Sequence, residues 1–294
     1  MIAHNKQAIP LWMNRNYLLL WSGQVISALG SQISQLAVPL LILSITGSPI
    51  QAGIAGALQA FPYLVFSLPA GAMIDRWDRK QVMIICDTGR ALSLASIVIV
   101  LLLGHLSMIQ LYLVLIIGGT LFVFFDLAVV SCLPKVVSKE QLPAATAQNL
   151  AIFNISALLG GPLGGALYSL SHVLPFAVDA ISYTASVLSL FWINVSFQEK
   201  RTLTPNKPWI EIKGGIVWLL QHPLIRSMAL LTGGFNLLTA GYSLLVIVLL
   251  QHLRASAFVV PPWDRTLGEV KTRVYTLTKK GVQYATATTI YSRV

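Results

Sequence analysis

Charged residues are scarce in this sequence, and their scarcity excludes the usual soluble classes. Only 10% of the 294 residues are Asp, Glu, Lys or Arg, whereas 55% are hydrophobic. Soluble globular domains carry about 25% charged residues, so this balance is typical of a membrane protein. Acidic residues are the scarcer sign, because 10 Asp and Glu stand against 20 Lys and Arg.

Cysteine is also rare, and the patterns of several chemistries are missing. Cys86 and Cys132 lie in apolar stretches, outside any CxxC pair or zinc-ligand spacing. No G-x-x-x-x-G-K-[ST] loop occurs, which argues against ATP as the energy source. No cluster of His and Glu or pair of nucleophile and base suggests an enzyme, so we expect no catalytic residue, metal site or cofactor. The basic residues are dispersed between apolar runs, so we expect no nucleic-acid partner.

Long apolar runs are what the sequence does contain. A helix needs about 20 apolar residues to cross roughly 30 Å of hydrocarbon. Runs of this kind occupy 17–45, 50–74, 82–103, 108–131, 145–170, 173–195 and 228–250. Backbone groups in hydrocarbon must form their hydrogen bonds within the segment, which favours helices. The sequence therefore predicts an all-α, polytopic membrane protein with the lipid bilayer as its surroundings.

Basic residues are sorted between two sets of loops. They precede the first run or follow the second, fourth and sixth: Lys6, Arg15, Arg76, Arg79, Lys80, Lys135, Lys139, Lys200, Arg201, Lys207, Lys213 and Arg226. The connections at 46–49, 104–107 and 171–172 contain no Lys or Arg. Because cytoplasmic loops carry the excess of Lys and Arg, we expect a cytoplasmic N-terminus.

The second run ends in the segment GAMIDRWDRKQ, in which charged residues follow a glycine at fixed distances. The residues concerned are Gly71, Asp75, Arg76, Arg79 and Lys80. A glycine lets two helices approach closely, and the charged turn can then join the second run to the third. The segment resembles the G-x-x-x-D-R-x-x-R-K signature of the major facilitator superfamily. Asp78 stands where many members have glycine.

Further stretches resemble the bacterial efflux branch of that superfamily, which contains macrolide and siderophore exporters. They are residues 118–150, LLGGPLGGAL, FAVDAISY and IEIKGGIVWLLQHPLIRS, so the resemblance covers roughly residues 12 to 250. It implies a secondary exporter in the bacterial cytoplasmic (inner) membrane, whose two six-helix halves rock around a midplane site. The implied partners are protons and a small lipophilic drug, macrolide or siderophore.

The fifth run carries glycines around a proline. Together with Gly160, they resemble the glycine-proline motif of drug-proton antiporters, except that one residue instead of two separates the proline from the glycine pair. The candidate site residues of the motif are Gly161, Pro162, Gly164 and Gly165. The alternative is a packing kink, because proline interrupts the helix ladder and glycine permits close contact.

Ionisable residues inside the apolar runs suggest function, because each is expensive in hydrocarbon. Asp87 and Arg90 share one helix face, and we predict that Arg90 forms a buried pair with Asp126. Together with the charged residues after the second run these would form one cytoplasmic network, interpreted as a gate or as pairing that merely permits burial. Asp179 lies remote from that network, and a proton carrier, a substrate contact and a helix tether all remain open for it.

Polar residues recur along the first run at three- and four-residue steps, with Gln32 beside them: Gln24, Ser27, Ser31 and Gln35. This stripe on one helix face is predicted to line a water-filled cavity for substrate or protons. Hydrogen bonds to a neighbouring helix are the alternative.

We divide the chain into a six-helix transporter half (1–195), a basic loop with an amphipathic helix (196–227), a seventh span (228–250) and a polar tail (251–294). The tail has no spanning run, and its basic residues fall on the side expected to be external. We interpret it as foreign to the family, with an altered reading frame near 251, or as an external domain; a hairpin around Lys280 and Gly281 suits either. The alternative to an exporter is therefore a truncated, membrane-inserted fragment that exports nothing when expressed alone.

Overall fold

A computed structural model of the chain describes residues 10–193, scattered positions between 214 and 235, and the segments 271–278 and 281–288. The chain divides into two compact units, 1–253 and 254–294, which are described separately.

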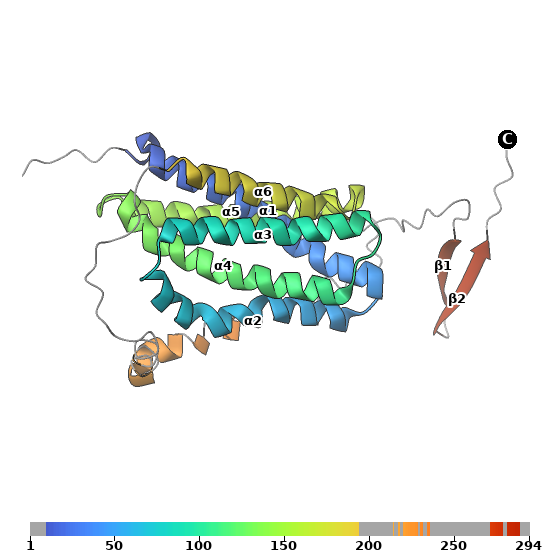
Figure 1. Cartoon of the computed structure of the whole chain (residues 1–294). Coiled ribbons are helices and arrows are strands. Elements are labelled where there is room, and N and C mark those ends of the chain that lie inside the picture. Colours follow the sequence, from blue (N-terminus) through green and yellow to red (C-terminus); the bar gives the residue numbers. More distant parts are fainter. Residues whose placement is uncertain are drawn as a thin grey trace, which may run out of the picture. The chain divides into compact units, whose positions relative to one another are not determined.

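The first unit contains six long helices that lie side by side (Figure 1). They are α1 (Arg15–Thr46), α2 (Pro49–Ile74), α3 (Arg79–Leu102), α4 (Met108–Val136), α5 (Leu142–Leu170) and α6 (Leu174–Phe191), preceded by the short 3-10 helix η1 (Leu11–Met13). Each is long and apolar enough to cross a membrane. The first six predicted spans and the all-α membrane fold are thus confirmed, and the chain is a multi-pass membrane protein. The predicted seventh span lies largely outside the described residues.

Polar residues define where the helices begin. The side chain of Asn14 accepts a hydrogen bond from the backbone N–H of Tyr17 at 3.2 Å and caps α1. Asp78 caps α3 by accepting from the N–H groups of Lys80 and Gln81 at 2.9 and 3.3 Å. The first N–H groups of a helix have no partner within it, so such caps stabilise the start. The Asp78 that replaces the signature glycine therefore has a structural use.

α1 lies at the centre of the bundle, where it packs mainly against α5 and α6, while α3 packs between α4 and α6, and α2 packs on α4. Glycines allow two of these crossings. A Cβ on Gly160 of α5 would lie 2.3 Å from the Gln32 side chain on α1, and one on Gly119 of α4 would lie 2.4 Å from the Gln59 carbonyl oxygen on α2. Because dispersion and close packing drive helix association in lipid, these contacts position the helices.

The outer surface of the bundle is apolar. Leu64 on α2 and Leu158 on α5 are 81% and 74% exposed. Such exposure would be costly in water, but lipid tails are as apolar as leucine. The burial pattern therefore fits helices that face lipid on their outer sides.

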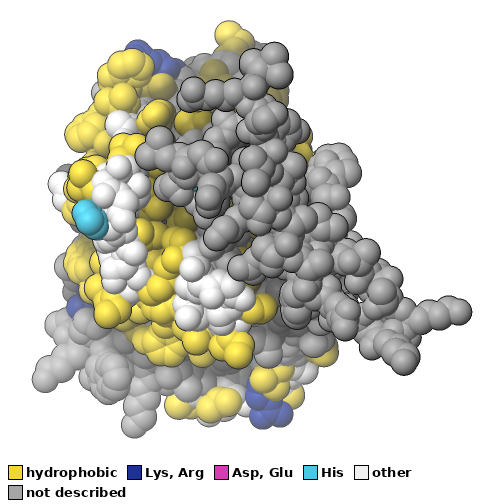
Figure 2. All heavy atoms as spheres, turned by 90° about the vertical axis from the view of Figure 1, so that its right-hand side faces the viewer, with side chains coloured by type: hydrophobic (Ala, Val, Ile, Leu, Met, Phe, Trp, Pro, Cys, Tyr) yellow, Lys and Arg dark blue, Asp and Glu magenta, His cyan; other side chains and the backbone are white. Residues whose placement is uncertain are grey.

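The two ends of the bundle differ in charge. The loops at 75–78 and 137–141 lie at one end, and those at 47–48, 103–107 and 171–173 lie at the other (Figure 1). Figure 2 looks onto the second end, where the described side chains are mainly hydrophobic or uncharged, Lys and Arg show only at the margins and no Asp or Glu is in view. The structure thus gathers at one end the loops that carry Lys and Arg.

The second unit contains a β-hairpin. Strand β1 (Lys271–Thr278) pairs antiparallel with β2 (Gly281–Thr288), with Thr278 opposite Gly281. This pairing agrees with the hairpin that the sequence analysis considers around Lys280 and Gly281.

Candidate functional site

Three buried charged residues lie close together where α1, α3 and α6 meet. Asp87 and Arg90 come from α3 and Asp179 from α6, and their exposed fractions are 0%, 7% and 2%. The guanidinium of Arg90 donates from Nη1 to Oδ1 of Asp87 at 3.2 Å. Its Nη2 donates to the Tyr183 hydroxyl on α6 and to Ser31 Oγ on α1 at 3.3 Å. One cation therefore connects three helices; we call these five residues the Arg90 cluster.

Aromatic rings surround the same guanidinium. Its central carbon lies 4.0 Å from the centroid of the Tyr183 ring, 5.5 Å from that of Phe122 and 5.7 Å from that of Phe125. The negative face of an aromatic ring attracts a cation at this range, most strongly where water is excluded. Arg90 is therefore held by rings from α4 and α6 as well as by hydrogen bonds.

Asp179 belongs to this cluster, although the sequence suggested that it was remote. It precedes Tyr183 by four residues, so both side chains lie on the α6 face that meets α1 and α3. Its Oδ1 accepts a hydrogen bond from Ser182 at 3.3 Å, and Ser34 on α1 also interacts with it. Arg90 and Asp179 interact electrostatically.

Asp126 does not form the predicted ion pair with Arg90 among the described residues. Arg90 pairs instead with Asp87, one turn away on its own helix. Asp126 is half-buried and interacts with Arg90 only electrostatically. The rings of Phe122 and Phe125 on the same helix occupy the space next to the guanidinium.

The signature segment forms a separate group at the end of the bundle. Arg79 donates from Nη1 to the Ser131 carbonyl of α4 at 2.9 Å, and its Nη2 lies 3.5 Å from Oδ1 of Asp75. Lys80 donates to the Ile193 carbonyl at 2.7 Å, just after α6. Eleven residues of α3 at about 1.5 Å each separate Arg79 from Arg90 by roughly 16 Å. The single network expected from the sequence is thus two groups.

The two other signature residues are Gly71 and Arg76. A Cβ on Gly71 would meet nothing within 4 Å, so no close helix contact depends on this glycine among the described residues. Arg76 is half-buried in the turn between α2 and α3.

The glycine motif of α5 divides between two faces. Gly160 and Gly164 face α1, where a Cβ on Gly164 would lie 2.9 Å from the Ile33 carbonyl oxygen. A Cβ on Gly161 would meet nothing within 4 Å, and one on Gly165 would reach only Leu36 at 4.0 Å. Pro162 is exposed. The close contact therefore comes from Gly160 and Gly164.

The polar stripe on α1 is not uniform. Ser27 is buried, and Ser31 lies 2.8 Å from the Tyr183 hydroxyl within the Arg90 cluster. Gln24 is half-buried and Gln35 is exposed. Ser31 therefore contacts neighbouring helices, whereas a water-filled cavity beside Gln24 and Gln35 remains a prediction.

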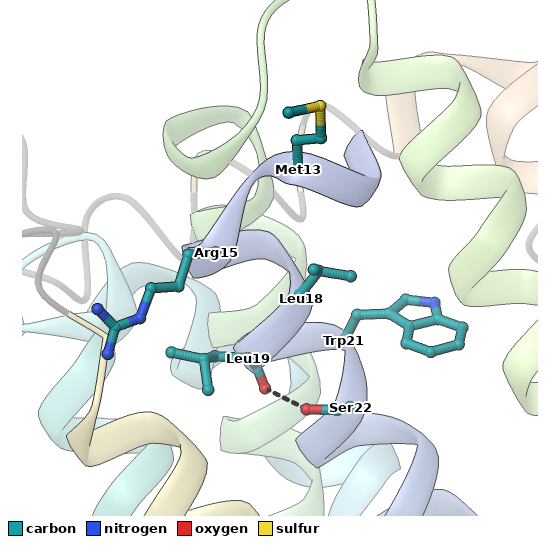
Figure 3. Close-up of a pocket in the computed structure, with 6 residues that line it drawn as sticks. All are labelled: Met13, Arg15, Leu18, Leu19, Trp21 and Ser22. Carbon is teal, nitrogen blue, oxygen red and sulfur yellow. Dashed lines mark hydrogen bonds between the residues drawn. The ribbon is translucent and has the colours of Figure 1, made fainter. Parts of the chain in front are cut away.

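A hollow of about 370 Å³ lies at the start of α1. Figure 3 shows its lining, in which the Leu18, Leu19 and Trp21 side chains form an apolar wall and Ser22 donates to the Leu19 carbonyl at 3.2 Å. Its lining contains none of the site residues predicted from the sequence. We therefore place the candidate site in the Arg90 cluster and not in this hollow.

Sequence reasoning missed Tyr183, Phe122 and Phe125. Tyr183 lies four residues after Asp179, a spacing that places both on one helix face. The two phenylalanines lie four residues and one residue before Asp126. A search for aromatic residues four positions from the acids inside the spans could have found Tyr183 and Phe122, whereas Phe125, one residue from Asp126, has no such spacing.

The comparison with known proteins agrees with the all-α membrane fold. The model of the Major Facilitator Superfamily matches residues 20–263. The match extends 12 residues beyond position 251, where the polar tail begins, and the assignment of that tail as foreign to the family stays a prediction.

Several relatives are exporters by name. Macrolide efflux protein A of Streptococcus pyogenes is 29% identical over 221 residues, which cover 74% of this chain and 54% of that protein. The multidrug efflux pump Tap of Mycolicibacterium fortuitum is 25% identical, with 72% and 54% covered. The enterobactin exporter EntS of Shigella boydii is 23% identical, with 69% and 49% covered. The chain thus spans about half the length of these curated relatives. The family match over most of its residues shows that this chain belongs to the major facilitator superfamily.

Proposed function

We propose that this chain takes part in secondary, proton-coupled efflux of small lipophilic molecules such as drugs, macrolides or siderophores. The observation that carries the proposal is the Arg90 cluster. Ionisable groups at this depth in a membrane protein are expensive and mark ion or substrate pathways. Relatives whose names specify macrolide, multidrug and enterobactin export support the same class of cargo.

The cluster suits energy coupling because its members come from helices that can move relative to one another. Arg90 on α3 contacts Tyr183 on α6 and Ser31 on α1. A proton bound at a carboxyl there changes the charge that these helices share. In alternating access, such a change favours one arrangement of helices over another.

We further propose roles for the other predicted residues. The signature segment acts as a cytoplasmic gate, because the exposed Asp75, the buried Arg79 and the half-buried Lys80 connect the ends of α2, α3, α4 and α6 through polar contacts. The sorting of basic residues supports a cytoplasmic N-terminus in a bacterial inner membrane. Gln24 and Gln35 are proposed to meet substrate or water.

The test is transport by the full chain in sealed lipid vesicles. Purified chain is reconstituted, a proton gradient is imposed, and movement of a macrolide or a lipophilic fluorescent dye is followed. We expect gradient-driven movement that falls at least tenfold in Arg90→Gln and is unchanged in Thr88→Ala, an exposed position on the same helix. Thermal unfolding of each variant shows whether it is folded.

The outcome separates the two functions considered from the sequence. No gradient-dependent movement by folded wild-type chain would contradict the proposal. That result would favour the alternative, a membrane-inserted chain without transport activity.

A further inference from the structure

The Arg90 cluster contains more acid than base. Asp87 and Asp179 both interact with Arg90, and the structure describes no second Lys or Arg within the cluster. With both carboxyls ionised, the cluster carries one net negative charge. A net charge buried in a low-dielectric interior is strongly unfavourable unless it is neutralised. One bound proton makes the cluster neutral.

The two carboxyls differ in their hydrogen bonds. The Asp179 carboxyl has hydroxyls beside it from two helices: Ser182 on α6 lies 3.3 Å from its Oδ1, although it also donates to the Asp179 backbone carbonyl at 2.7 Å, and Ser34 on α1 interacts with it as well. Asp87 uses Oδ1 for Arg90 and also interacts with Ser186 on α6, but its Oδ2 is buried with no hydrogen-bond partner among the described residues. A buried carboxylate oxygen without a donor is costly. The free oxygen of Asp87 is therefore the better place for the proton.

Arg90 does not depend on Asp87 alone. Its Nη2 donates to Tyr183 and Ser31, and the Tyr183 ring lies against the guanidinium at 4.0 Å. When Asp87 becomes neutral, these contacts and the charge of Asp179 remain. Protonation can therefore occur without leaving the guanidinium unpaired in the protein interior.

We propose that Asp87 is the proton-binding carboxyl of the cluster and that Asp179 stays ionised as the permanent counter-ion of Arg90. This assignment deepens the proposed function, on which its role in efflux rests. The titratable and charged groups that surround the pair are Arg90 and Cys86 on α3, Tyr183 on α6 and Asp126 on α4. From α1 the cluster receives the hydroxyl of Ser31.

Infrared spectroscopy of the full chain in lipid vesicles tests the assignment, because a protonated carboxyl absorbs separately from a carboxylate. During a pH titration we expect one carboxylic-acid C=O band from a buried group. Asp87→Glu should shift its frequency, whereas Asp179→Glu should leave it in place. Both changes keep the number of acids, so the charge balance is the same.

Replacing each of the two aspartates by asparagine tests whether the cluster holds one acid more than base. Asp87→Asn and Asp179→Asn each leave one acid for one base, so the band should disappear in both. Asp75→Asn, at the 57% exposed side chain of the signature segment, should leave the band unchanged. Where an amide variant fails to fold in a thermal scan, the two Glu variants still decide.

Two results would overturn the proposal: no titrating band in wild-type chain, or a band that Asp179→Glu shifts and Asp87→Glu does not. The measurement does not require transport. A band that behaves as expected in vesicles without gradient-driven efflux would uphold the proton site and reject the proposed function. Gradient-driven efflux without the band would uphold the proposed function and reject the proton site.

Discussion

The hydroxyl oxygens of Tyr183 on α6 and Ser31 on α1 lie 2.8 Å apart, and both accept hydrogen bonds from Arg90 on α3. This three-way contact is the point where the first, third and sixth helices of the bundle meet. Its strength can be measured by removing single groups.

Tyr183→Phe deletes the hydroxyl and keeps the ring over the guanidinium. A hydrogen bond to a charged group contributes roughly 1.5–3 kcal/mol, so the free energy of unfolding should fall by about 2 kcal/mol. Thermal unfolding in detergent micelles measures the change. Tyr63→Phe removes a hydroxyl from a 51% exposed tyrosine on α2 and should have little effect. Equal losses in the two variants would show that the contact with Arg90 contributes nothing.

A double-mutant cycle measures the pair of Asp87 and Arg90. The cycle is measured at a pH at which Asp87 is ionised, since removing one partner of a buried ion pair typically costs about 3–5 kcal/mol by leaving the other charge without compensation. We expect Arg90→Gln to be more destabilising than Asp87→Asn combined with Arg90→Gln. Simple additivity of the single losses would contradict the pairing. As a control, Asp75→Asn should cost about 1 kcal/mol or less, because the Asp75 carboxylate that pairs with Arg79 is 57% exposed to its surroundings.

Gly160→Ala should separate α5 from α1, whereas Gly161→Ala should be tolerated. The added Cβ at Gly160 would lie 2.3 Å from the Gln32 side chain, and that at Gly161 would meet nothing within 4 Å. Overpacking typically costs about 1–3 kcal/mol. Thermal stability of the two neighbouring variants gives the comparison, and a difference below about 0.5 kcal/mol would be at odds with the close crossing.

The contact between α4 and α2 allows a stricter test of close helix packing. A Cβ on Gly119 would lie 2.4 Å from the backbone oxygen of Gln59, which cannot rotate away, while one on Gly118 would meet nothing within 4 Å. We expect Gly119→Ala to lower the unfolding temperature, and cross-linking between cysteines on α2 and α4 to become less efficient. Gly118→Ala should leave both measurements unchanged. Similar behaviour of the two variants would mean that the helices do not approach at this point.

Orientation can be checked by labelling. Cysteines at Ser107, an exposed residue before α4, and at Lys139, an exposed residue after it, lie at opposite ends of the bundle. An impermeant thiol reagent added outside intact cells should label Ser107→Cys and not Lys139→Cys. The native Cys86 and Cys132 are buried, so the background should be low. Labelling of Lys139→Cys alone would reverse the proposed topology.

The number of described helices and their approximate limits could be predicted, because hydropathy identifies the segments that cross the hydrocarbon. The span expected at 50–74 corresponds to α2 (Pro49–Ile74) almost residue for residue. α4 was expected to end at 131 but continues to Val136. Pro134 and Lys135 made that last turn look like a loop, although a helix can extend beyond the hydrocarbon once the span is complete.

The Arg90 cluster could be predicted only where it is local. The pair of Asp87 and Arg90 follows from three-residue spacing on one helix. The contacts of Arg90 with Tyr183 and Ser31 depend on which distant helices pack together, and hydropathy does not contain that information. For the same reason Asp126 was predicted as the partner, and Asp179 was placed outside the group.

The central place of α1 also bears on the order of events during synthesis. α1 leaves the ribosome first, whereas its main neighbours α5 and α6 follow after most of the other helices. At about 5–20 residues per second, the delay is on the order of ten seconds. During that time the hydroxyls of Ser27 and Ser31 have no partner from α6, but each already donates to a carbonyl of its own helix, at 3.4 Å to Gln24 and 2.7 Å to Ser27. These internal bonds give the hydroxyls of Ser27 and Ser31 an acceptor within α1 before α5 and α6 are inserted into the bilayer.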